Sequence, residues 1–175
     1  MWIHRPQKET QFIDNLLGLD RQVMIVQGAR QVGKTCFILH ALEQLQDYPQ
    51  LKINLLYAST MNLEGQNFMG RDFVGLAAAG EDFIKNLRLH FGDFERLAKP
   101  ALIFIDEVDR FPPVLEFVQT LAEYSRHFKF VLTGSNLENI RMQNAATGRR
   151  QYFDLYPITF SEFLNIAKPE LLTYY

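Results

Sequence analysis

The stretch Gly28-Ala-Arg-Gln-Val-Gly-Lys-Thr35 decides the fold of this 175-residue chain. It fits the pattern G-x-x-x-x-G-K-[ST] without a mismatch. A short apolar run, Val23-Met-Ile-Val-Gln27, precedes it, and in residues 34–45 apolar side chains recur every three or four positions. A strand, a glycine-rich loop and a helix in this order form the context in which the pattern makes a phosphate-binding loop of the Walker A type. We therefore predict that this segment holds phosphate groups.

Each residue type in the loop has a physical task. Glycines let the main chain wrap so that successive N–H groups point inward, and the helix that follows presents its positive end to the phosphates. The Lys34 ammonium supplies a charge to the β- and γ-phosphates, and the Thr35 hydroxyl can ligate Mg²⁺. The residues predicted to bind the nucleotide are Gly28, Ala29, Arg30, Gln31, Val32, Gly33, Lys34, Thr35 and Cys36.

A second motif, Leu102-Ile-Phe-Ile-Asp-Glu107, has the form of a Walker B strand that ends in two acids. A carboxylate at the end of a buried strand can hold Mg²⁺, usually through a water molecule, because this ion keeps much of its hydration shell. The acid beside it can orient and polarise an attacking water. The predicted metal ligands are thus Thr35 and Asp106, and Glu107 and Lys34 are predicted to be catalytic.

The polar stretch Thr133-Gly-Ser-Asn136 follows a run, residues 130–133, that predicts a strand. In the expected strand order this strand lies between that of the phosphate loop and that of the two acids, so its tip faces the γ-phosphate. Asn136 is the predicted third catalytic residue, with a contact to that phosphate or to the attacking water, and Ser135 and Thr133 are its substitutes. A helix N-cap at Ser135 or Asn136 is the alternative.

The rest of the chain predicts strands that alternate with helices, which implies a parallel sheet with helices on both faces and ligands beyond the carboxyl ends of its strands. Residues 58–80, with four glycines, predict a long irregular insertion. The predicted helices are 9–18, 34–45, 81–91, one that starts at Pro112-Pro113 and includes Ala122, and one that the capping-box pattern Thr159-Phe-Ser-Glu162 opens and that ends at Leu164. The predicted strands are 23–27, 52–57, 101–106, 130–133 and 151–155.

Composition excludes several classes of protein. Eighteen basic and 20 acidic residues give a net charge of −2, so no global basic field exists to hold nucleic acid or anionic lipid. The single cysteine, Cys36, rules out an internal disulfide and is expected to be packed rather than redox-active. The four histidines show no ligand spacing, and no apolar run is long enough to span a membrane. We expect a soluble protein of a reducing compartment, the cytoplasm.

Two pairs of charged residues have more than one interpretation. Arg149 or Arg150 could reach a phosphate, in its own site or a neighbour's, as an arginine finger does. A solvated basic face, or an ion pair with Asp154, is the interpretation we favour. Asp109 and Arg110 are expected to form a solvated turn outside the site.

Four motifs in order resemble the prokaryotic AAA+-type predicted ATPases, which carry an N-terminal ATPase domain and a C-terminal domain often likened to nucleases. The resemblance runs from about residue 3 to residue 164. The motifs that carry it are Gly28-Ala-Arg-Gln-Val-Gly-Lys-Thr35, Ile105-Asp-Glu-Val-Asp-Arg-Phe-Pro112, Leu132-Thr-Gly-Ser135, and Gly148-Arg149 followed by Leu155-Tyr-Pro-Ile-Thr-Phe-Ser-Glu-Phe163.

The resemblance implies a three-layer α/β/α P-loop NTPase fold, AAA+-like, with a five-stranded parallel sheet. It implies ATP and Mg²⁺ as ligands, the roles given above to the loop and to the paired acids, and a polar sensor near Asn136. It also suggests that Ile3-His-Arg5 and the following residues form the linker that borders the adenine in related ATPases. Cys36 departs from the family, where a second threonine is common, and this change should leave phosphate binding intact.

Residues 1–164 are expected to form the ATPase core. Residues 165–175 would begin a truncated lid or C-terminal region, because the last 16 residues are crowded with apolar side chains that have little to cover them. We expect hydrolysis to drive a conformational step in a missing C-terminal domain or in a second copy of the chain. A protein or DNA partner would act through that domain, although the DNA role rests on analogy alone. A nucleotide switch that does not hydrolyse and, less favoured, a small-molecule P-loop kinase are the alternatives.

Overall fold

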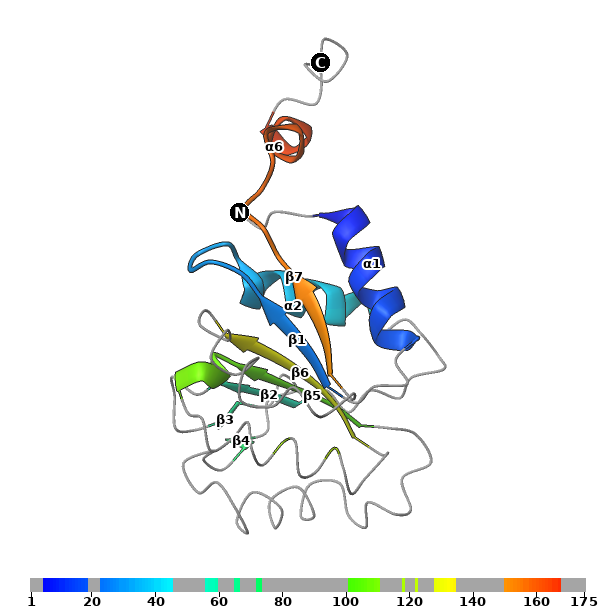
Figure 1. Ribbon diagram of the computed structural model, residues 1–175, viewed down its shortest axis with the longest axis vertical. Coiled ribbons are helices and arrows are strands. Elements are labelled where there is room, and N and C mark those ends of the chain that lie inside the picture. Colours follow the sequence, from blue (N-terminus) through cyan, green and yellow to red (C-terminus); the bar gives the residue numbers. More distant parts are fainter. Residues whose placement is uncertain are drawn as a thin grey trace.

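The computed structural model describes a parallel sheet with helices packed against it (Figure 1). Its order is β2-β5-β6-β1-β7, and every neighbouring pair is parallel, so the predicted five-stranded parallel sheet is confirmed. The strands are β1 (Val23–Gln27), β2 (Leu56–Ser59), β5 (Ala101–Asp106), β6 (Phe128–Gly134) and β7 (Arg150–Asp154). The structure describes residues 5–18, 23–45, 56–59, 65–66, 72–73, 101–110, 118, 122, 128–134 and 150–167.

Three α-helices have bounds within these residues, namely α1 (Pro6–Leu17), α2 (Lys34–Leu45) and α6 (Phe160–Ala167), and a 3-10 helix, η2 (Val108–Arg110), follows β5. The helix α1 starts three residues earlier than predicted, because Pro6 has the fixed φ that suits a first helical turn and lacks an N–H that would need a partner. The strand β6 is longer than predicted at both ends, and β7 begins and ends one residue earlier.

Side chains on both faces of the sheet are buried. In β1, Met24 and Val26 belong to one core cluster with Phe104 of β5 and with residues of α1 and α2. Val23 and Ile25 alternate with them and so point to the opposite face, where they are buried as well. Burial on both faces explains why these strands are continuous apolar runs rather than alternating ones.

Three aromatic rings join α1 and α2 to the sheet. Phe12 meets Phe37 and Phe153 edge-on, with ring centroids 5.5 Å and 5.4 Å apart. Phe37 and Phe153 stack at 5.7 Å. Such contacts add to the burial of the rings themselves, so they help to fix the helix that begins at the phosphate loop.

A buried carboxylate also connects these two helices. Glu9 is 1% exposed and accepts hydrogen bonds from the Arg5 main-chain N–H at 2.9 Å and from Gln44 Nε2 at 2.8 Å. His40 Nδ1 lies 3.1 Å from Glu9 Oε2. A buried carboxylate needs such partners, and the two on α2, Gln44 and His40, hold α1 against α2.

The insertion expected at residues 58–80 contains more regular structure than predicted. Residues 58 and 59 complete β2, and two short strands, β3 (Gly65–Gln66) and β4 (Asp72–Phe73), form an antiparallel pair. The expectation of a long irregular insertion was therefore wrong for these six residues, and the rest of the segment lies outside the described part. The predicted helix at 81–91 and the start of the predicted strand at 52–57 lie outside the described residues, whereas Val118 and Ala122 of the helix after Pro113 are helical and buried.

The helix α6 begins with the predicted capping box. Thr159 Oγ1 accepts from the Glu162 N–H at 3.2 Å, and Glu162 Oε2 accepts from the Thr159 N–H at 2.8 Å. In the apolar tail, Phe160 and Phe163 are exposed and Leu164 is buried, whereas residues 168–175 lie outside the described part. No helix within the described ranges is long and apolar enough to cross a membrane.

Arg5 fixes this helix to the start of α1. Its guanidinium donates to both carboxylate oxygens of Glu162, at 2.8 and 3.1 Å, and to the Tyr156 carbonyl at 2.8 Å. The Arg5 side chain is 5% exposed and that of Glu162 is 26% exposed. Burial acts to raise the pKa of Glu162, but hydrogen bonds from Arg5 and from Thr159 outweigh it and hold that pKa below its ordinary 4.5.

We expect Glu162→Gln to lower the free energy of unfolding by about 1–3 kcal/mol at neutral pH, because it removes a charged partner of a buried guanidinium. The carboxylate stabilises the fold above the ordinary pKa of 4.5, and this contribution is lost as the pH falls through the lowered value. Urea unfolding followed by circular dichroism should therefore show a gap between variant and wild type that closes in acid. A gap that is independent of pH would contradict this, and Glu43→Gln, at an exposed position of α2, is the matched control.

Candidate functional site

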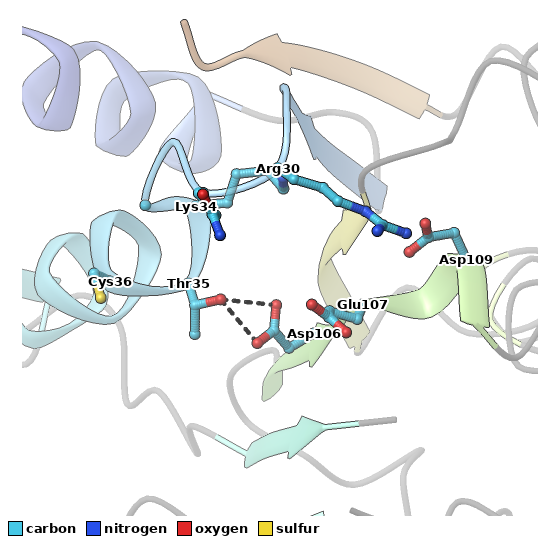
Figure 2. A pocket seen from close by; sticks show the side chains of 9 residues that line it. Arg30, Lys34, Thr35, Cys36, Asp106, Glu107 and Asp109 are labelled. Carbon is cyan, nitrogen blue, oxygen red and sulfur yellow. Dashed lines mark hydrogen bonds between the residues drawn. The ribbon is translucent and has the colours of Figure 1, made fainter. Parts of the chain in front are cut away.

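The carboxyl ends of the parallel strands meet at one edge of the sheet, where Gln27 pairs in register with Gly134 on one side and with Asp154 on the other. A cleft of about 350 Å³ opens at this edge (Figure 2). Its volume is within the range of small-molecule sites. It is lined by Arg30, Gln31, Gly33, Lys34, Thr35, Cys36, Asp106, Glu107 and Asp109.

The glycine-rich loop needs its two glycines for different reasons. A Cβ on Gly28 would lie 2.2 Å from the Leu155 carbonyl oxygen, so only glycine lets the loop pass the end of β7. The main chain is held there, because the Leu155 N–H donates to the Gln27 carbonyl at 2.8 Å. Gly33 has open space around its Cα but a φ of +84°, a conformation that side chains disfavour. Gln31 has a φ of 64°, and the loop therefore turns sharply twice before α2 begins.

Lys34 is the first residue of α2 and points back into the loop. Its Nζ donates to the main-chain carbonyls of Gly28 and Ala29, both at 2.9 Å, and the residue is 8% exposed. Burial lowers the pKa of Lys34 below its ordinary 10.5, while the negative charges of nearby acids, Asp109 foremost, oppose this shift. The Lys34 ammonium thus lies in the loop, beside the cleft into which an anion would bind.

Thr35 and Asp106 join the two predicted motifs directly. The Thr35 hydroxyl lies 3.1 Å from Asp106 Oδ1 and 2.9 Å from Oδ2 and donates to this carboxylate (Figure 2). A hydroxyl has one hydrogen and two lone pairs. The Thr35 hydroxyl gives its hydrogen to Asp106, so its oxygen keeps lone pairs that can ligate a metal ion. The arrangement brings together residues that are 71 positions apart.

The segment after Asp106 turns back over the cleft. Glu107 has a φ of 53°, and η2 follows, which places Asp109 on the cleft wall. Figure 2 shows the Arg30 side chain extending toward Asp109, with Glu107 between that acid and Asp106. The expectation that Asp109 lies in a turn outside the site was wrong, because the left-handed backbone at Glu107 directs the chain toward the loop.

Three other expectations at the site are corrected. Arg150 is the first residue of β7 and is 6% exposed, so it is neither a solvated charge nor near the cleft, which lies at the other end of the strands. Asp154, its suggested ion-pair partner, ends β7 and instead accepts a hydrogen bond from Gln27 Nε2. Cys36 is exposed rather than packed, since the apolar face of α2 begins at Phe37.

Some predicted residues have other positions. Gly28, Ala29 and Val32 belong to the loop but are not among the residues that line the cleft. Asn136, Ser135 and Arg149 lie outside the described residues, and their roles stay predictions. Arg5, expected near an adenine, bonds to α6 instead of lining the cleft, whereas Ile3 and His4 lie outside the described part.

The groups present fit a nucleotide with Mg²⁺. The loop offers a buried ammonium and the amino end of α2, which attract phosphate, and Thr35 and Asp106 offer the oxygen ligands that Mg²⁺ prefers. Among the described residues, no group of three or more His, Cys, Asp or Glu side chains could hold a metal ion by itself. A metal with few protein ligands is usual where substrate phosphates and water complete the coordination.

A parallel sheet, a glycine-rich loop that leads from a central strand into a helix, and an acidic strand end opposite that loop define an ATPase-type nucleotide-binding domain. The family model of the AAA domain matches residues 20–164, and the chain belongs to this family. A search of curated proteins found no match.

Solved structures share the fold at low identity. Drosophila ORC bound to DNA has a TM-score of 0.66 and 16% identity over 98% of this chain and 46% of its own. Closed-state Hsp104 with ATPγS and FITC casein has a TM-score of 0.61 and 15% identity, over 99% of this chain and 31% of its own. C. elegans PCH-2 has a TM-score of 0.59 and 12% identity, over 99% of this chain and 49% of its own. The chain thus spans between 31% and 49% of each of these proteins.

We expect alanine at each of the two loop glycines to destabilise the fold for a different reason. Gly33→Ala should cost about 1–2 kcal/mol of unfolding free energy, the cost of a left-handed side chain in open space. Gly28→Ala should cost at least as much and should also displace Leu155, because its Cβ would collide with that carbonyl. Urea unfolding and the NMR signal of the Leu155 amide separate the two cases. An unchanged Leu155 signal in Gly28→Ala would show that the close contact is wrong.

Proposed function

We propose that this domain binds ATP with Mg²⁺ in the cleft beside the glycine-rich loop and hydrolyses it. One observation carries the proposal. Lys34 and Thr35 of the loop line the same cleft as Asp106, the last residue of β5, and Glu107, the residue after that strand. The hydrogen bond from Thr35 to Asp106 fixes the two motifs against each other. The similarity to Hsp104, whose structure was solved with ATPγS, supports the choice of nucleotide.

In this proposal Lys34 and the loop amides hold the β- and γ-phosphates. Thr35 and Asp106 hold Mg²⁺, which when bound neutralises charge on the phosphate oxygens. Glu107 orients the attacking water and takes its proton. Asn136, beyond the end of β6, contacts the γ-phosphate or that water.

We further propose that hydrolysis moves a part of the assembly beyond this domain. This chain covers only 31% to 49% of each matched structure, which supports a partner domain outside the part that it spans. An arginine supplied from elsewhere would complete the site, because Arg150 lies at the wrong end of the sheet. Turnover by the separate chain should then be slow and should rise with protein concentration.

Glu107→Gln should bind ATP nearly as wild type does and lose turnover by roughly a hundredfold or more, the usual contribution of a general base. Lys34→Ala should instead weaken ATP binding by roughly tenfold to a hundredfold, because it removes charge-assisted hydrogen bonds. Fluorescence titration with a labelled ATP and a phosphate-release assay measure the two effects separately.

Glu43→Gln is the matched control for the first substitution, since Glu43 is exposed on α2 away from the cleft-lining residues. Unchanged turnover in Glu107→Gln would remove this acid from its role. ATP binding without phosphate release by the wild-type chain, at every protein concentration and with Mg²⁺ present, would favour a nucleotide switch over a hydrolase.

The affinity for ATP should fall as the pH rises through the lowered pKa of Lys34 toward 10.5. Phosphate binds the charged form of the lysine. Above the pKa of Lys34 the free protein must therefore take up a proton when ATP binds, and this weakens the affinity. Titrations across this alkaline range, with folding checked by circular dichroism, measure the fall. Lys34→Arg keeps its charge and should show no such fall, whatever its starting affinity; an equal fall in both proteins would assign the effect to another group.

A further inference from the structure

Thr133 is a buried polar residue with an unusual position. It is the penultimate residue of β6, lies between β5 and β1 in the sheet, and has no exposed surface. The residues before it in the strand, Val131 and Leu132, are buried and apolar. A hydroxyl in such surroundings is costly unless it is hydrogen-bonded. The partners of this hydroxyl therefore reveal what the residue does.

The Thr133 hydroxyl has two partners, which are the side chain of one acid and the main chain of the next. Its Oγ1 donates to Asp106 Oδ1 and accepts from the Glu107 N–H at 2.8 Å. The strand register explains this contact, because Ile105 pairs with Leu132 and the next residues, Asp106 and Thr133, continue the two strands side by side. One hydroxyl thus bonds to both sides of the junction between the two acids.

Glu107 needs a partner at this point because its backbone is unfavourable. Its φ of 53° lies in the left-handed region, which residues other than glycine rarely adopt and which persists only where the surroundings impose it. The bond from the Glu107 N–H to Thr133 is a contact that can hold this conformation. This φ in turn decides where the Glu107 side chain starts and sends η2 back toward the cleft.

We propose that Thr133 is the positioning residue that sets both acids of the site, a role that rests on the function proposed above. It orients the Asp106 carboxylate together with Thr35 and holds the Glu107 main chain in its left-handed turn. Thr133 does not line the cleft, and its hydroxyl hydrogen is directed to Asp106, so it acts through the acids and not on the phosphate.

Two substitutions separate the hydroxyl from the shape of the side chain. Thr133→Val keeps the volume and branching but leaves the Glu107 N–H without its acceptor. Thr133→Ser keeps the hydroxyl and loses only a methyl group. If the role depends on the two hydrogen bonds, serine should preserve it and valine should not.

The main experiment compares steady-state ATP hydrolysis by the wild-type chain and both variants. Thr133→Val should lower kcat by roughly tenfold to a hundredfold, as loss of an outer partner of a metal-site carboxylate does. Its KM and its affinity for labelled ATP should stay within about threefold of wild type, because the loop residues that hold the phosphates are unchanged. Thr133→Ser should recover most of kcat.

Hydrogen exchange at the Glu107 amide, measured by NMR without nucleotide, provides a readout that is independent of activity. In the wild-type chain this amide should be protected by roughly a hundredfold or more, since its acceptor is fully buried. Exchange should speed up by roughly tenfold in Thr133→Val and stay near wild type in Thr133→Ser, because one hydrogen bond separates them. Urea unfolding of each variant verifies that it is folded.

Several outcomes would overturn the proposal. They are an unprotected Glu107 amide in the wild-type chain, full kcat in Thr133→Val, or equal losses in the valine and serine variants. The wild-type exchange measurement decides the matter even if Thr133→Val does not fold. A wild-type chain that binds ATP and releases no phosphate would contradict the hydrolase proposal alone, and exchange at Glu107 would still report whether Thr133 holds the acids.

Discussion

The Asp106 carboxylate is where three segments of this chain meet. It accepts hydrogen bonds from Thr35, at the start of α2, and from Thr133, at the end of β6, while its own main chain ends β5. A carboxylate that accepts from two hydroxyls is restrained in both position and rotation. The loop, the acidic strand and the strand between β5 and β1 are therefore held in one arrangement before any ligand arrives, and this preorganisation gives the cleft its chemistry.

Burial of the sheet on both faces determines where that carboxylate can lie. Strands such as β1 and β5 have apolar side chains on each face, so a polar group along their length would lose its water. In β5 the first charged side chain is that of Asp106, where the strand ends and the cleft opens. The packing of α1 and α2 through Phe12, Phe37 and Phe153 then holds the phosphate loop at this same edge.

The central parts of the fold and the site could be predicted because their chemistry is local. The glycine pattern with Lys34, and an acid directly after an apolar run, each specify a strand end without knowledge of the rest. Asp109 could not be placed, because its position depends on a left-handed φ at Glu107 that no glycine signals. The burial of Arg150 could not be predicted either, because charge favours exposure, yet this residue begins a strand whose other end faces the cleft. The precise task of Thr133 depends on the strand register, which a sequence alone does not contain.

The position of Cys36 gives this domain a built-in chemical handle. It is the single thiol of the chain, it is exposed, and it lines the cleft one residue after Thr35. A maleimide fluorophore would thus attach once per molecule, beside the cleft, with no engineered substitution. A thiol reagent and a bound ligand would compete for the same space, so the rate of Cys36 alkylation would report how much of the cleft is occupied by ligand. Electrophilic inhibitors of the cleft could also form a covalent bond with this thiol.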